Sequence, residues 1–146
     1  MEGSNQLIIA GSLSFIAAAL HIGIIFGGPD WYRFFGAGEA MAQAAESGDW
    51  MPTLITLGIA SVLTLWGFYA LSGAGVLTPL PLLKVALVLI TGVYLLRGVA
   101  GFILPFVSQH PAITQNSVTF WMVSSAVCCL FGMFHLLGLL SRWKVL

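Results

Sequence analysis

The chain has 146 residues, of which 59% are hydrophobic and only 7% are charged, and its mean hydropathy is +1.00. A soluble domain carries about 25% charged residues, so this composition excludes an ordinary soluble protein. Five basic and five acidic residues balance each other, which leaves no basic surface for nucleic acid. We therefore expect a single integral membrane domain over residues 1–146, surrounded by membrane lipid and with no nucleic-acid partner.

Four apolar segments are each long enough to cross a hydrocarbon core, which needs about 20 residues. They cover approximately residues 7–26, 52–72, 80–104 and 117–140. A cleaved signal peptide is the alternative for the first segment, but residues 1–6 carry Glu2 and no basic residue, against the usual pattern. The predicted fold class is an all-α membrane protein, a four-transmembrane-helix bundle with both termini on one side. The short link between the second and third segments favours antiparallel neighbours.

The connection from residue 27 to residue 51 is too long for a simple turn. Asp30 can cap a helix, and apolar and polar residues then separate onto different faces. This pattern predicts a short interfacial helix over about residues 30–47. Gly36 and Gly38 can interrupt it, so two short helices are an equally good interpretation.

The few basic residues predict the orientation. Lys84, Arg142 and Lys144 lie near the side of the termini, whereas Arg33 is the only loop cation on the other side. The positive-inside rule then predicts cytoplasmic N- and C-termini. We expect the chain in a bacterial inner membrane.

Arg97 is the residue that most needs an explanation, because it interrupts the third apolar segment. An arginine at the bilayer centre costs at least ~2.5–3.5 kcal/mol and usually faces a partner or a wet cavity. His21 lies at a similar depth in the first segment, roughly 21 Å along the helix at about 1.5 Å per residue. Both lie beneath the 27–51 connection. We therefore predict a polar pocket at this outer end, formed by the following candidate ligand-binding residues: His21, Arg33, Glu39, Tyr94 and Arg97.

Two interpretations of Arg97 stay open. It can pair with Glu39 or Asp30 and fix the connection to the bundle, or it can bind an anionic or carbonyl-bearing hydrophobic ligand such as a lipid or a quinone, because a guanidinium only donates hydrogen bonds. His135 lies at a different depth from His21, which argues against a shared haem or metal. The adjacent Cys128 and Cys129 have no CxxC spacing and are expected to be apolar fillers. No metal and no cofactor are predicted.

The predicted function is that of a small membrane protein that binds a lipid or a quinone, or of an accessory subunit in a larger membrane complex or homo-oligomer. The first alternative is a membrane enzyme acting on a lipid or a quinone, in which His21 is the acid–base group and Arg97 stabilises negative charge. The second alternative is an oligomeric small transporter. The sequence leaves open whether the chain is catalytic.

Overall fold

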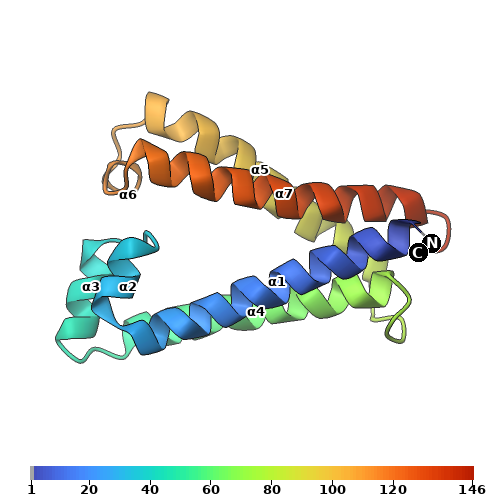
Figure 1. Cartoon of the computed structure of the whole chain (residues 1–146), viewed down its shortest axis with the longest axis horizontal. Coiled ribbons are helices and arrows are strands. Elements are labelled where there is room, and N and C mark those ends of the chain that lie inside the picture. Colours follow the sequence, from blue (N-terminus) through green and yellow to red (C-terminus); the bar gives the residue numbers. More distant parts are fainter. Residues whose placement is uncertain (1) are drawn as a thin grey trace.

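The computed structural model describes residues 2–146, which fold into helices joined by short turns. Four helices are long and apolar enough to cross a membrane: α1 (Glu2–Gly27), α4 (Met51–Gly73), α5 (Leu83–Val107) and α7 (Val118–Arg142). Figure 1 shows both termini at the same end of the bundle. The predicted all-α, four-helix membrane bundle is confirmed, and the chain is an integral membrane protein.

The third long helix differs most from its predicted limits. It begins at Leu83 rather than at residue 80, because Pro79 and Pro81 lack backbone N–H groups and Leu82 has a left-handed backbone with φ of 53°. It also continues past Pro105 to Val107. Pro105 therefore lies within the last turn of α5 and does not end it.

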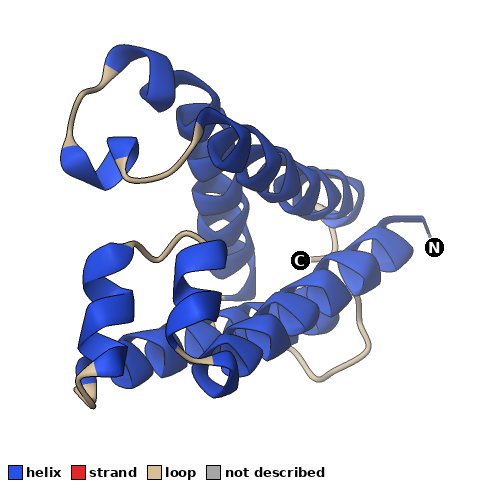
Figure 2. Ribbon diagram, turned by 60° about the vertical axis from the view of Figure 1, so that its left-hand side comes forward, coloured by secondary structure: helices blue, strands red, loops and turns tan. Residues whose placement is uncertain are grey.

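The long helices form two close pairs, α1 with α4 and α5 with α7. The pairs converge near the termini, where α1 packs on α7, and they diverge toward the other end, as Figures 1 and 2 show. Glycines permit the close approaches. A Cβ added at Gly138 would overlap Leu7, and one added at Gly67 would overlap Phe15. The sequence favoured α4 and α5 as neighbours, but their mutual contact is much less extensive than that within the pairs.

Several polar side chains of the long helices are buried between them. Ser14 and His135 are fully buried, and Tyr94 is 6% exposed. On α7, Ser125 is fully buried and Ser117 is exposed. Tyr94 belongs to a central apolar cluster whose buried members are Ala18, Leu63, Ile90, Tyr94 and Phe131.

The 27–51 connection forms two short helices, α2 (Pro29–Phe34) and α3 (Glu39–Glu46). The prediction of a single helix over residues 30–47 is therefore wrong, and the alternative of two short helices is confirmed. The break occurs at Gly36 and Gly38, whose φ angles of 83° and 98° suit glycine. Tyr32 is 2% exposed and anchors α2 beside Ile24 and Ala42. A further short helix, α6 (Pro111–Thr114), precedes α7.

Candidate ligand-binding site

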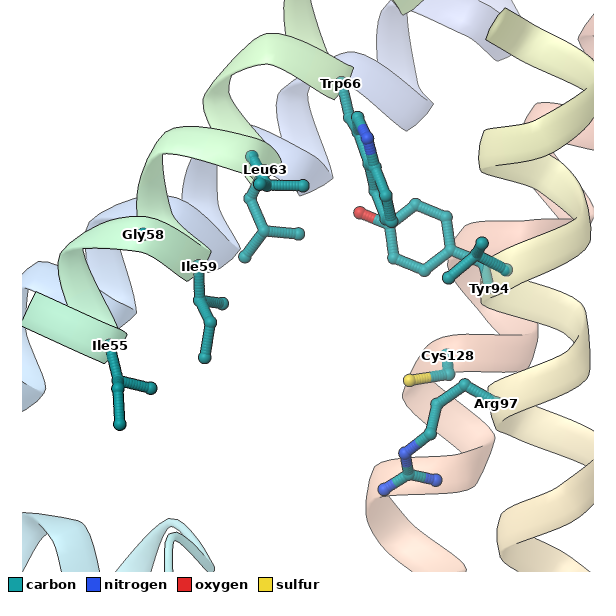
Figure 3. A pocket seen from close by; sticks show the side chains of 10 residues that line it. Ile55, Gly58, Ile59, Leu63, Trp66, Tyr94, Arg97 and Cys128 are labelled. Carbon is teal, nitrogen blue, oxygen red and sulfur yellow. The ribbon is translucent and has the colours of Figure 1, made fainter. Parts of the chain in front are cut away.

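A cavity of about 440 Å³ lies between the two helix pairs, from the middle of the long helices toward the end away from the termini. Its α4 wall is aliphatic, with Ile55 and Ile59 on one helical face. Figure 3 shows this wall opposite Tyr94 and Arg97 on α5 and Cys128 on α7. The rings of Trp66 and Tyr94, with centres 5.1 Å apart, close the end nearer the termini. The cavity lies between the apolar helices α4 and α5 where they diverge, and we call it the lateral cavity.

Arg97 is the charged residue that lines this cavity. Its Cα lies ten residues before the end of α5, roughly 15 Å at about 1.5 Å per residue, and its side chain extends toward the outer end. Its Nη1 donates to the Ser125 hydroxyl at 3.3 Å and its Nη2 donates to the Ser124 hydroxyl at 3.1 Å. The guanidinium carbon lies 4.7 Å from the centre of the Trp121 ring, a cation–π contact. Three residues of α7 therefore orient this cation.

Glycine at position 101 makes room for the guanidinium. A Cβ added at Gly101 would overlap both Arg97 Nη1 and the Ser125 hydroxyl. The side chain of Arg97 thus lies along the α5 surface one turn further on. This is the direction expected for an arginine that places its charge near the membrane surface.

Glu39 and Asp30 do not pair with Arg97. Over residues 2–146 the ion pairs all involve Arg33, which contacts Asp30 at 3.2 Å, Glu39 at 2.9 Å and Glu46 at 2.8 Å. Arg33 holds Glu39 through both Nε and Nη2. These hydrogen bonds, together with the charge of Arg33, hold the pKa of Glu39 below its ordinary value. The hydrogen bonds to Glu39 and Glu46 hold the pKa of Arg33 above its own. This cluster joins α2 to α3.

His21 also lies outside the cavity lining. Its Nδ1 is 2.7 Å from the Ala17 carbonyl oxygen in its own helix. Because a carbonyl only accepts, Nδ1 carries the hydrogen in this bond. Of the five predicted site residues, the structure therefore brings only Tyr94 and Arg97 to the cavity.

A buried polar layer lies next to the closed end of the cavity. The Tyr94 hydroxyl and the Ser14 hydroxyl are 2.9 Å apart, and the Tyr94 ring lies 5.2 Å from the His135 ring between centres. His135 Nδ1 is 2.9 Å from the Phe131 carbonyl oxygen, so it donates there. Its Nε2 is buried and has no hydrogen-bond partner in the described chain.

The connections at the outer end hold one another in place beyond the cavity. Asn116 donates to the Gly36 carbonyl oxygen at 3.1 Å, which ties the α2–α3 connection to the start of α7. The Trp121 indole N–H donates to the Ile113 carbonyl oxygen at 2.9 Å. Trp121, which contacts Arg97, is thereby fixed by α6.

Sequence reasoning missed several lining residues. Trp66 and the isoleucines of α4 line the cavity, but their apolar spacing is also that of a lipid-facing helix surface. Cys128 was interpreted as a filler, and it borders the cavity. Nothing in the sequence indicated that Trp121 and Ser124 of α7 meet Arg97.

Among residues 2–146, no group of three or more His, Cys, Asp or Glu side chains is placed to hold a metal ion. Comparisons with protein-family models, curated proteins and solved structures gave no match. What this chain does must therefore be inferred from its own residues.

Proposed function

We propose that this membrane protein binds an amphiphilic molecule in the lateral cavity, with an anionic or carbonyl-bearing head at Arg97 and an apolar body along α4. The observation that carries the proposal is an oriented arginine in an apolar cavity that has no carboxylate partner within residues 2–146. An uncompensated cation inside a membrane is expensive. A ligand oxygen would lower that free energy.

The donor capacity of Arg97 supports this role. A guanidinium carries several N–H groups and accepts no hydrogen bond, and two of those groups are used on serine hydroxyls. Neutral hydroxyls orient the group without neutralising it. The remaining donors suit a phosphate, carboxylate or quinone oxygen.

The cavity itself supports an apolar ligand body. Its volume of about 440 Å³ falls within the roughly 300–1,000 Å³ of ordinary small-molecule sites. Ile55, Ile59 and Trp66 offer an aliphatic and aromatic wall, and the opening lies at membrane depth. A lipid or a quinone could enter from the bilayer without crossing water.

Binding can be measured by titrating the purified protein in dodecyl maltoside with decylubiquinone and, separately, with dioleoylphosphatidylglycerol. Tryptophan fluorescence is a suitable readout, because Trp66 and Trp121 lie beside the proposed ligand. Arg97→Gln removes a charge-assisted hydrogen bond of about 1.5–3 kcal/mol, so the affinity should fall roughly 10- to 150-fold. The affinity of Arg97→Lys should lie between those of wild type and Arg97→Gln, because a lysine keeps the charge but cannot bind both serine hydroxyls as the planar guanidinium does.

Lys144→Gln is the charge-matched control, because Lys144 is exposed at the opposite end of the bundle. Circular dichroism and gel filtration would verify that each variant folds. The ligand that loses affinity in Arg97→Gln but not in Lys144→Gln identifies the class, quinone or phospholipid. If Arg97→Gln binds each ligand as tightly as wild type does, the proposal is contradicted.

The predicted enzyme alternative relied on His21 as the acid–base group. Its hydrogen bond to Ala17 and its position outside the cavity lining give it no contact with a ligand at Arg97. No observation in the described chain favours the transporter or accessory-subunit alternatives over ligand binding.

A further inference from the structure

A second hollow, of about 610 Å³, lies at the opposite end of the molecule, beside the termini. It is bounded by the connection after α4, the first turn of α5 and the last residues of α7. Unlike the lateral cavity, it contains two cations, Lys84 from α5 and Arg142 from α7. Its chemistry is therefore that of an anion site.

Neither cation is neutralised. No carboxylate among residues 2–146, chain end included, lies within ion-pair distance of Lys84 or Arg142. Lys84 Nζ donates to the Trp143 carbonyl oxygen at 2.8 Å and lies 4.0 Å from the centre of the Trp143 ring. Both contacts hold the ammonium in place and leave further N–H groups for an anion.

Arg142 is only partly satisfied by the protein. Its Nη1 donates to the Ser4 hydroxyl at 2.6 Å. Its Nε is buried and has no hydrogen-bond partner in the described chain. Its Nη2 lies 3.4 Å from a Cβ added at Gly75, a residue of the lining, and makes no hydrogen bond in the described chain. An anion in this hollow could accept a hydrogen bond from Nη2.

The start of α5 adds a third favourable element. Residues 82–85 line the hollow, and no side chain caps this helix. The free N–H groups in the first turn of a long helix carry partial positive charge and favour anions, phosphate in particular. Lys84 lies within this turn, so the helix end and the ammonium act on the same space.

The rim of the hollow is apolar and exposed. Leu82 is 78% exposed, Val85 is 54% exposed and Leu77 is 38% exposed. A rim of this kind suits acyl chains better than a water-soluble phosphate compound. We infer that this hollow binds the phosphate headgroup of an anionic phospholipid, from the leaflet on the side of the chain termini.

Native mass spectrometry of the purified protein can test this by titration with dioleoylphosphatidylglycerol, dioleoylphosphatidylcholine and inorganic phosphate. Phosphatidylglycerol should bind more tightly than phosphatidylcholine, and inorganic phosphate should not displace it. Lys84→Gln and Arg142→Gln should each weaken phosphatidylglycerol binding about tenfold, which corresponds to about 1.4 kcal/mol. Lys144→Gln is the matched control on the same face and should leave binding unchanged.

Arg142→Lys covers the case in which Arg142→Gln disturbs the Ser4 contact, because it keeps the charge and should retain most of the binding. Equal affinity for the two phospholipids would overturn the inference. So would displacement by inorganic phosphate, or an equal loss in Lys144→Gln. The inference is independent of the proposed function, since an Arg97 variant changes only the lateral cavity and the Lys84 variant only this hollow.

Discussion

The contact between α5 and α7 that positions Arg97 depends on Gly98, which lies one residue after it. A Cβ added there would overlap the Cys129 sulfur and would lie 3.0 Å from the Cys129 backbone nitrogen and 3.2 Å from the Ser125 carbonyl oxygen. The sulfur can rotate away, but the backbone atoms cannot. Gly98→Ala therefore requires the two helices to separate.

The expected loss of stability follows from these contacts. Extra methyl groups in a packed core cost about 1–3 kcal/mol, and the backbone contacts favour the upper part of that range. Alanine recovers about 0.8–1.0 kcal/mol of helix propensity, so the net destabilisation should be roughly 1–2 kcal/mol. Gly92 is the matched control in the same helix, because nothing lies within 4 Å of a Cβ added there. The free energy of unfolding of Gly92→Ala should equal or exceed that of the wild type.

The assay is equilibrium unfolding in mixtures of sodium dodecyl sulfate and dodecyl maltoside, followed by circular dichroism. We expect the free energies of unfolding of the two variants to differ by about 2–3 kcal/mol, which is the steric cost at Gly98, because both variants gain the same helix propensity. Equal unfolding free energies for Gly98→Ala and Gly92→Ala would refute the close α5–α7 packing on which the site depends.

Three further predictions concern the outer end. The Glu39 carboxyl should titrate below its ordinary pKa of 4.5, as ¹³C chemical shifts would report, and Arg33→Gln should abolish this shift. A carboxyl whose pKa is lowered by folding stabilises the fold at pH values above the pKa of the unfolded chain. The α2–α3 contact should therefore loosen only as the pH falls through the lowered pKa. His21→Ala should leave the dissociation constant of the cavity ligand unchanged, and a loss as large as that in Arg97→Gln would restore the predicted role of His21. Gly36→Ala should speed hydrogen exchange over residues 29–46, because φ is 83° and the Cβ would overlap Phe120; unchanged exchange would contradict the docked arrangement.

The four spans could be predicted because hydropathy over about 20 residues is a property of one segment alone. Arg97 could be singled out for the same reason, since a cation in an apolar run is conspicuous without knowledge of its neighbours. Its partners could not be predicted. They depend on which helices pair, and the close α5–α7 approach is made possible by Gly98 and Gly101.

The placement of His21 shows the limit of a depth argument. Counting residues along parallel helices gives the height of a side chain but not its direction around the helix axis. His21 was predicted at a similar height to Arg97, but it lies outside the cavity lining. The acidic residues were assigned to the more distant arginine, although Asp30 is only three residues from Arg33 and on the same helix face. Local pairing within the connection satisfies these carboxylates.

The most direct test of the lateral site is native mass spectrometry of the protein extracted from its own membrane, comparing wild type, Arg97→Gln and Lys144→Gln. We predict that wild type and Lys144→Gln retain a bound mass that Arg97→Gln lacks, that of a molecule with an apolar body and an oxygen-bearing head. Arg97→Gln should remain folded. An identical set of bound masses in all three proteins would contradict the proposal that Arg97 holds a ligand.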